Sequence, residues 1–341
     1  MLPKKPLPAL IVILLDLIGI GVMLLIFTLF HHMLDLDSGE PLQNIVFGAT
    51  PTPTVEAVAT EEPTLAPQAT ATPQITATPA PTPTPEPGDF SATFPTDEPN
   101  VENAIGVYKT DTLRVVVTEG HTDDAVYYVA DVWIRNIREF KTAFAKDKFG
   151  RGLYEMPDTI AEHNGAVLAI TGDTYGSSSS SVVIRNGNLY RDSGDGDVCI
   201  LYADGVMESY YQADFDLDAV IARGAYQGWT FGPKLIDNGA VPGSYNTTDA
   251  IIAHNPRAAI GYYEPGHYCL VVVDGRQGGY SRGMTLDELS ELFLSFGCVD
   301  AYNLDGGQSA MLVFQDQIVN QPYKDGRAIS DIIYFGGNDP A

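Results

Sequence analysis

The stretch AYNLDGGQSAMLVF, residues 301–314, sets an Asp-Gly-Gly turn between two apolar strands. Asp-Gly-Gly is an ordinary turn sequence, because glycine adopts backbone conformations closed to other residues. The same turn carries polar side chains that a plain hairpin does not need: Asn303, Asp305, Gln308 and Ser309. The stretch therefore predicts both a connection between core strands and a candidate functional loop.

Around this stretch, short apolar segments alternate with turns from residue 101 onward. Asn186-Gly187 and Asp204-Gly205 each separate two strand-like runs, which is the signal of a tight β-hairpin. Many hairpins and few helical segments predict an α+β domain with a mixed, largely antiparallel sheet core and a few helices. We see no regular repeat.

Several segments of this region predict helices, among them short ones ending near Asn164-Gly165 and at Gly224. Thr285 and Glu288 match a capping box, and Gly297 supplies a left-handed stop, so residues 285–297 form the clearest helix. Residues 137–150 carry phenylalanines at helical spacing, which predicts a second helix ending at Gly150.

The composition limits the classes of partner. The chain has 19 Lys and Arg against 44 Asp and Glu, a formal net charge of −25. We expect no nucleic acid partner, because nucleic-acid binding relies on basic contacts to phosphate. A phosphate-bearing ligand would need local arginines that act against the overall field. The cysteines, Cys199, Cys269 and Cys298, form no CxxC motif or Cys/His cluster, and their pairing stays open.

The N-terminal region predicts a membrane anchor. Residues 7–30 are apolar apart from Asp16 and Thr28, and such a run is long enough to cross a hydrocarbon core of about 30 Å. Lys4 and Lys5 precede it, so the positive-inside rule leaves residues 1–6 in the cytoplasm. We therefore expect a single-pass membrane protein with an uncleaved signal-anchor and an extracytoplasmic domain.

A linker is predicted between the anchor and the domain. Residues 50–88 contain 11 Thr and 10 Pro among 39 residues. Such a segment cannot bury enough apolar surface to offset its ordering entropy. We predict a disordered Thr/Pro-rich linker over residues 31–99, followed by one catalytic domain over residues 100–338.

Four further loops at the ends of predicted strands are rich in glycine and polar residues. Side chains at strand ends are held rigidly and yet remain accessible, as in many catalytic sites. Each residue also has a structural interpretation: Asp-Gly is a common turn, and Arg257 could form a surface ion pair. The candidates in these loops are Asp173, Thr174, Tyr175, Lys234, His254, Asn255, Arg257, Asp274, Arg276, Gln277, Tyr280 and Ser281.

Together these loops resemble the phosphodiester glycosidase family. The matching motifs are NPRAAIGY (255–262), VVDGRQGGYSRGMTLDEL (272–289), AYNLDGGQSAM (301–311), AITGDTYG (169–176) and FGPKLIDNG (231–239). The resemblance covers residues 100–337. This chain has Thr171 where the family often has Asn, and Gln308 where the family often has Gly or Ser.

The resemblance implies hydrolysis of a sugar-1-phosphodiester, between the anomeric carbon and a phosphate oxygen, in a cell-surface or exopolysaccharide glycan. Arg257 and Arg276 would hold the phosphate, because a guanidinium matches two phosphate oxygens at once; Lys234 is a weaker third. Asp173 and Asp305 would supply the nucleophile or general base, and which does what stays open. Sugar hydroxyls would be oriented by Tyr280, Asn303, Gln308 and Ser309. Gly306 and Gly307 would let the ligand approach the protein backbone.

Several alternatives remain at this point. No cofactor is predicted, although Asp173 and Asp305 could jointly bind a divalent cation. The domain could instead hydrolyse a plain glycosidic bond in wall polysaccharide. It could also be a non-catalytic surface module that binds a phosphate-bearing carbohydrate or cell-wall glycan.

Overall fold

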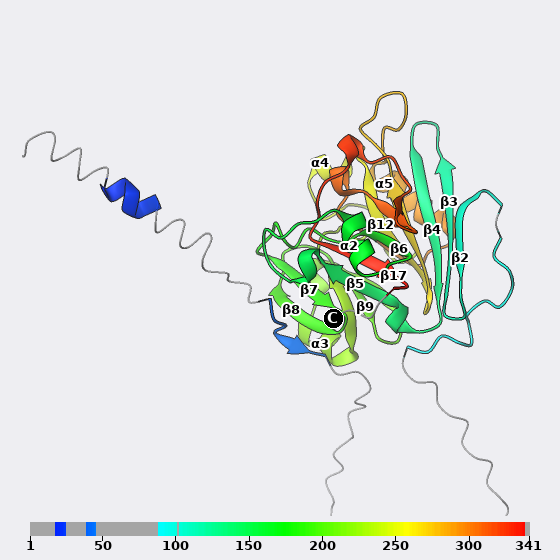
Figure 1. Ribbon diagram of the computed structural model, residues 1–341, viewed down its shortest axis with the longest axis horizontal. Helices are drawn as coiled ribbons and strands as arrows, with labels where there is room; N and C mark the ends of the chain where they lie inside the picture. Colours follow the sequence, from blue (N-terminus) through cyan, green and yellow to red (C-terminus); the bar gives the residue numbers. More distant parts are fainter. Residues whose placement is uncertain (1–17, 25–38, 46–87, 101, 338–341) are drawn as a thin grey trace, which may run out of the picture.

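The computed structural model describes residues 18–24, 39–45, 88–100 and 102–337 (Figure 1). In these residues, three antiparallel sheets are joined by a few short helices, which confirms the predicted largely antiparallel α+β core. Figure 1 shows β2, β3 and β4 on one side of the domain, β7, β8 and β9 on the other, and β5, β6 and β17 between them.

Sheet I has the strand order β14-β12-β13-β4-β3-β2. Its strands are β2 (Ala104–Lys109), β3 (Leu113–His121), β4 (Val126–Ile134), β12 (Arg257–Glu264), β13 (His267–Val273) and β14 (Asp300–Asn303). Arg257 pairs with Val273, and Ala259 pairs with Asn303. The start of β12 and the ends of β13 and β14 therefore lie side by side at the same end of this sheet.

Sheet II has the order β16-β15-β6-β17-β5. Its strands are β5 (Phe140–Phe144), β6 (Leu168–Thr171), β15 (Leu312–Phe314), β16 (Gln317–Ile318) and β17 (Asp331–Phe335). The amide of Asp305 donates to the carbonyl of Gly172, 3.1 Å away. This bond joins the end of β6 to the turn that follows β14 of sheet I.

Sheet III has the order β1-β8-β7-β11-β9-β10. Its strands are β1 (Gln43–Asn44), β7 (Ser181–Arg185), β8 (Asn188–Ser193), β9 (Val198–Tyr202), β10 (Met207–Tyr210) and β11 (Ala225–Trp229). The predicted hairpins at Asn186-Gly187 and Asp204-Gly205 are the β7–β8 and β9–β10 connections, and both are confirmed.

One large core is shared by the three sheets. It includes Val132 from sheet I, Ile170 from sheet II and Leu201 from sheet III, all fully buried. Burial of apolar side chains is the main force that holds the sheets together. The loops at the strand ends are thereby fixed on a rigid scaffold.

Helices cover the outer faces of the sheets. They are α2 (Pro157–His163), α3 (Leu217–Arg223), α4 (Asp249–Ile252) and α5 (Leu286–Phe296), with short 3-10 turns η1 (Ile137–Glu139), η2 (Ala145–Asp147), η3 (Gln212–Asp214), η4 (Gly307–Ser309) and η5 (Tyr323–Asp325). The predicted capping box of α5 is present, and Gly297 ends the helix with a φ of +86°. Both devices are local, so the sequence alone specifies them.

The helix predicted over residues 137–150 is wrong. The segment forms η1, strand β5 and η2 instead. Phe140 pairs with Phe335 and Phe144 pairs with Asp331, so β5 completes the edge of sheet II. Pairing with a strand about 190 residues later overrides the local helical spacing.

The N-terminal predictions fall mostly outside the described residues. Residues 18–24 are helical, and within the described residues no helix is both long and apolar enough to cross a membrane. Two described parts of the predicted linker differ from expectation: β1 pairs with β8, and Phe90 and Phe94 are buried. The prediction of disorder is therefore wrong for residues 39–45 and 88–99, where Ile45, Phe90 and Phe94 are buried.

Candidate functional site

The turn of residues 303–308 forms one wall of a cavity of about 370 Å³, which we call the arginine cavity. Its other walls come from the start of β12, from the loop after β13 and from the loop before β17. The lining residues are Phe231, Ala250, Ile251, Asn255, Pro256, Arg257, Arg276, Asn303, Asp305, Gly306, Gly307, Gln308 and Arg327. The structure thus brings together residues of four segments that the sequence singled out (231–239, 255–262, 272–289 and 301–311), and adds α4 and the loop before β17, which it did not.

The two glycines of the turn allow close contact with β12 and with Arg276. A Cβ on Gly306 would lie 2.6 Å from the carbonyl oxygen of Pro256, which a real side chain cannot tolerate. Gly307 has a φ of +63°, and a Cβ there would lie 3.4 Å from Nη1 of Arg276. Glycine is required at both positions for the turn to lie against the wall of the cavity.

Arg257 is 3% exposed and is fixed by backbone carbonyls. Its Nε donates to Met284 O at 2.8 Å, and its Nη2 donates to Ala253 O at 2.6 Å. Burial and the neighbouring charge of Arg276 lower the pKa of Arg257 to about 10, so it stays protonated at neutral pH. Two guanidinium groups that repel each other in this way would both be stabilised by an anion between them.

Arg276 is exposed and reaches the cavity from the loop after β13. Its Nη2 donates to Oδ1 of Asn255 at 2.6 Å, and its guanidinium lies 5.6 Å from the ring centre of Tyr323. The side chain of Asn255 is itself held by the carbonyls of Ala250 and Ala253. Asn255 therefore positions Arg276. Because the amide of Asn255 is neutral, it does not compensate the positive charge of Arg276.

Arg327 is the functional candidate that sequence reasoning missed. Its Nη2 lies 3.1 Å from Oδ2 of Asp305, and its Nε donates to Oγ of Ser309 at 2.6 Å. Its side chain is 52% exposed. The available signal was the segment KDGRAIS (324–330), which places an arginine in a glycine turn just before a buried strand.

Asp305 is 7% exposed and lies at the base of the arginine cavity. Burial raises the pKa of Asp305, while the hydroxyl of Ser309 and the charge of Arg327 oppose that rise. The negative charge of Asp173 adds to the rise. Among the residues that the structure describes, Asp305 alone contributes a carboxylate to the lining of this cavity.

Gln308 and Asn303 complete the wall. Nε2 of Gln308 donates to Gly326 O at 2.7 Å, so Gln308 fastens the turn to the loop that carries Arg327. Nδ2 of Asn303 donates to Gly232 O at 2.7 Å, whereas its buried Oδ1 has no hydrogen-bond partner among the described residues. A ligand hydroxyl can satisfy that acceptor.

Asp173 does not line the arginine cavity. It is 2% exposed, its Oδ2 lies 3.1 Å from Nη2 of Arg185, and its Oδ1 accepts from the amide of Tyr175 at 2.9 Å. Arg185 also contacts Asp331, with Nε 2.7 Å from Oδ2. We call Asp173, Arg185 and Asp331 the buried cluster. It lies next to Asp305, because Asp173 directly follows Gly172, whose carbonyl accepts a hydrogen bond from the amide of Asp305.

The loop of residues 274–282 is held by Asp274, which is 1% exposed. Its carboxylate accepts from Asn320 Nδ2, from Gln321 N and from the hydroxyl of Tyr280. The hydroxyl of Ser281 donates to the carbonyl of Asp274, and Gln277 bonds to Gln321. These predicted site residues shape the loop that presents Arg276 and do not line the arginine cavity.

The remaining candidates also lie outside the arginine cavity. Lys234 pairs with Asp237 at 3.3 Å, and His254 faces Glu288, also at 3.3 Å. Tyr175 is 1% exposed and stacks on Phe149. Thr174 lines a neighbouring cavity, described below.

Comparison with known proteins identifies the family. Residues 164–336 match the family model described as phosphodiester glycosidase. The chain belongs to the phosphodiester glycosidase family. The match spans every residue that lines the arginine cavity, so the cavity lies within the family domain.

The chain is 30% identical, over 253 residues, to the SPbeta prophage-derived uncharacterized protein YomE of Bacillus subtilis (strain 168). The match covers 66% of this chain and 39% of that protein, so the chain spans about two fifths of the relative's length.

Two solved structures share the fold. The catalytic domain of zebrafish N-acetylglucosamine-1-phosphodiester alpha-N-acetylglucosaminidase, auto-inhibited by its pro-peptide, has a TM-score of 0.54 and 19% identity, over 67% of this chain and 84% of that chain. A hypothetical protein from Synechocystis has a TM-score of 0.50 and 15% identity, over 68% of this chain and 64% of that chain. At these identities the likeness concerns the fold alone.

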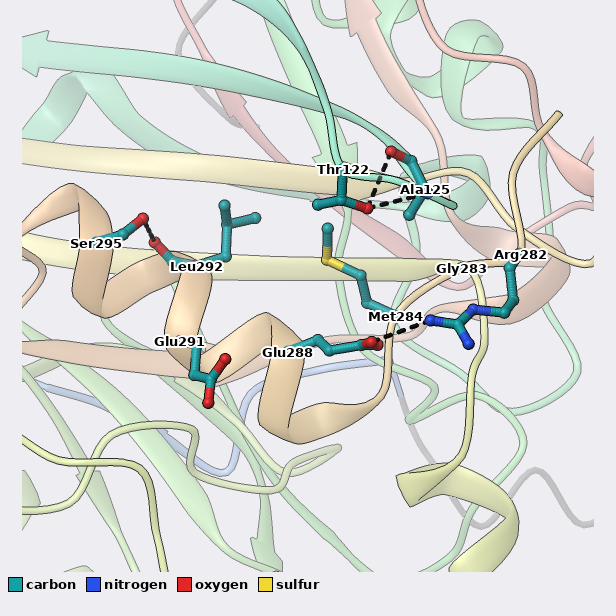
Figure 2. Close-up of a pocket in the computed structure, with 9 residues that line it drawn as sticks. All are labelled: Thr122, Ala125, Arg282, Gly283, Met284, Glu288, Glu291, Leu292 and Ser295. Atoms are coloured by element: carbon teal, nitrogen blue, oxygen red, sulfur yellow. Dashed lines mark hydrogen bonds and ion pairs between the residues drawn. The ribbon is translucent and has the colours of Figure 1, made fainter.

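A different hollow of about 260 Å³ lies between α5 and the β3–β4 connection (Figure 2). Figure 2 shows Arg282 directed toward Glu288, with which it forms an ion pair at 3.1 Å. Glu291 adds a second carboxylate to the lining. Two carboxylates and one arginine line this hollow, and the arginine is paired with Glu288. The cationic pocket of this chain is therefore the arginine cavity and not this hollow.

The described residues offer no metal centre. No group of three His, Cys, Asp or Glu side chains among them is arranged to hold an ion. The carboxylates of Asp173 and Asp305, considered as joint ligands of a cation, each face an arginine. Cys199, Cys269 and Cys298 are free and buried; Sγ of Cys269 and Sγ of Cys298 are 3.6 Å apart, well beyond the ~2.05 Å of a disulfide.

Proposed function

We propose that this protein hydrolyses the bond between the anomeric carbon of a sugar and a phosphate oxygen in a sugar-1-phosphodiester. The observation that carries the proposal is the arginine cavity, where three guanidinium groups and one carboxylate meet in a protein with a net charge of −25. Arg257 and Arg276 repel each other, as the pKa of Arg257, lowered by burial and by Arg276, indicates, and an anion bound between them would relieve that repulsion.

The chemistry matches these groups. Water attacks the anomeric carbon and loses one proton to a general base, the carbon–oxygen bond breaks, and its electron pair leaves on the oxygen of a phosphate monoester. That leaving group is already acidic, so support of its growing negative charge matters more than its protonation. Arg257 and Arg276 would supply that support as preorganised donors in a partly enclosed site.

Asp305 would face the anomeric carbon. The transition state of glycoside hydrolysis has oxocarbenium character, and a nearby carboxylate stabilises it. We assign this role to Asp305 because it lines the cavity, whereas Asp173 is enclosed by Arg185 and backbone amides. Asp173 then acts as a positioning residue, behind the turn that holds Asp305.

The substrate would be a glycan outside the cytoplasm. The apolar segment of residues 7–30 and the Thr/Pro-rich segment after it support a domain held at a distance from a membrane. A cell-surface or exopolysaccharide glycan with phosphodiester links would be within reach of such a domain. Fractionation with protease protection of intact cells tests this location: the domain should be digested from outside.

A product screen tests the activity. The full chain is incubated with a panel of sugar-1-phosphodiesters carrying glycerol or aryl groups, and release of reducing sugar is measured. Release by the wild type and loss of release in Asp305→Asn are expected. Binding of these compounds without any turnover would contradict the proposal and favour a glycan-binding module.

A further inference from the structure

A second cavity, of about 240 Å³, lies on the other side of the Asp305–Arg327 ion pair. Both residues line this cavity as well as the arginine cavity. The remaining lining residues within the described chain are uncharged: Tyr154, Thr174, Ser177, Ala328, Ile329 and Ser330. We call this space the tyrosine cavity. One carboxylate thus faces a cationic cavity on one side and a neutral, hydroxyl-rich cavity on the other.

Tyr154 is placed as a fixed aromatic wall. Tyr154 is 38% exposed, so its aromatic side chain is accessible to a ligand. The backbone is anchored on both sides, because Gly152 N donates to Gly176 O at 3.0 Å and Glu155 pairs with Ile329. A Cβ on Gly176 would lie 2.5 Å from Oγ of Ser330, so the glycine lets this loop pack closely against the segment before β17, which also lines the cavity.

Two hydroxyl groups face the same cavity. Oγ1 of Thr174 and Oγ of Ser177 are 2.5 Å apart, and the serine hydroxyl can also reach the carbonyl of Thr174 at 2.9 Å. Hydroxyl groups rotate to donate or accept as a ligand requires. An aromatic wall with a few polar groups is the usual lining of a small-molecule pocket.

We infer that the tyrosine cavity binds the sugar ring, that the arginine cavity binds the phosphate, and that the anomeric carbon lies over Asp305 between them. This inference rests on the proposed function and adds the placement of the two halves of the substrate. A neutral polyol matches hydroxyls and the apolar face of Tyr154. A phosphate matches the guanidinium groups of Arg257 and Arg276.

The two products allow a direct test, because each should bind one cavity. Equilibrium binding of free hexoses and N-acetylhexosamines, and separately of glycerol phosphate, is measured by calorimetry on the full chain. In Tyr154→Ala, the Kd of the best-bound sugar should rise about tenfold while that of glycerol phosphate stays unchanged. In Arg276→Gln, the Kd of glycerol phosphate should rise about tenfold or more while that of the sugar stays unchanged.

Tyr154→Phe is the matched control and should retain sugar binding, because it keeps the ring. Thermal unfolding of each variant checks that an exposed substitution leaves the fold intact. If Tyr154→Ala weakens the binding of glycerol phosphate and not that of the sugar, the two cavities have been assigned the wrong way round. If Tyr154→Ala leaves sugar binding unchanged, the sugar does not bind in the tyrosine cavity. The binding measurements do not require turnover, so they test the cavity assignment separately from the proposed function. If sugar binding depends on Tyr154 but no phosphodiester is hydrolysed, the proposed function is overturned and the cavity assignment stays intact.

Discussion

The arginine cavity and the buried cluster are built from the same residue types at adjacent strand ends. In the buried cluster, Arg185 is 2% exposed and lies between Asp173 and Asp331. In the arginine cavity, by contrast, Arg327 is 52% exposed at the side chain while it contacts Asp305. Both contain an Arg–Asp pair at 3.1 Å, so the ion-pair distance alone does not separate them.

The difference lies in the balance of charge and in access. The buried cluster has two carboxylates for one guanidinium, and backbone amides of Tyr175 and Thr230 take further oxygen lone pairs of Asp173. The arginine cavity has three guanidinium groups for one carboxylate and opens to solvent. An excess of cations that solvent can reach is suited to bind an anion, whereas an enclosed cluster is suited to fix the backbone.

The largest effect is expected at the carboxylate of the open site. Asp305→Asn should lower kcat by about 10²–10⁴-fold, because the amide cannot act as a base, as a nucleophile or as a counter-charge. Asp325→Asn, an exposed aspartate on η5, is the matched control and should keep wild-type kcat. Initial rates on the best phosphodiester substrate give the comparison. Equal rates for both variants would remove Asp305 from catalysis.

The buried cluster should respond in stability. Arg185→Met removes one partner of a buried ionic network and should cost about 3–5 kcal/mol in the free energy of unfolding. Arg282→Met removes an arginine whose side chain is 46% exposed and should cost under about 1 kcal/mol. Denaturant unfolding measures both. Equal losses would contradict the structural role that we assign to the buried cluster.

Substrate affinity should depend on the open arginines. Arg276→Gln should reduce kcat/KM about 10–100-fold, because a charge-assisted contact to phosphate is lost. Arg282→Gln changes the same charge in the same loop and should have little effect, since Arg282 pairs with Asp124 and Glu288. Steady-state kinetics on one substrate decides; a larger loss in Arg282→Gln would place the phosphate elsewhere.

The smallest expected effect is a shift in pH dependence. Burial raises the pKa of Asp305 and Arg327 opposes that rise, so activity that needs the ionised carboxylate falls as pH drops through this raised pKa. In Arg327→Gln the opposing charge is gone, and the acidic limb of kcat/KM should move to higher pH. Lys324→Gln removes an exposed charge on the same loop and is the control. A limb that moves to lower pH, or equally in both variants, would contradict this coupling.

Local signals were sufficient for part of the fold. The capping box of Thr285 and Glu288 and the hairpin at Asn186-Gly187 depend on a few neighbouring residues, and both are present. The spacing of Phe140 and Phe144 indicated a helix, because pairing of β5 with the distant β17 leaves no trace in the local pattern.

The candidate site was predictable in outline only. Arg257, Arg276 and Asp305 were predicted and meet in one cavity. Asp173 and Asp305 each follow a buried strand near a glycine, so sequence could not distinguish them; Arg185, which encloses Asp173, comes from β7 in another sheet. Arg327 escaped notice because its contact with Asp305 spans 22 residues and two loops.

The central claim is tested most directly by the position of bond cleavage. The protein is incubated with a sugar-1-phosphodiester in water enriched in ¹⁸O, and the sugar and phosphate products are analysed by mass spectrometry. Attack at the anomeric carbon predicts ¹⁸O in the hydroxyl of the released sugar and none in the phosphate monoester. Label in the phosphate, or no hydrolysis of any sugar-1-phosphodiester, would contradict the account.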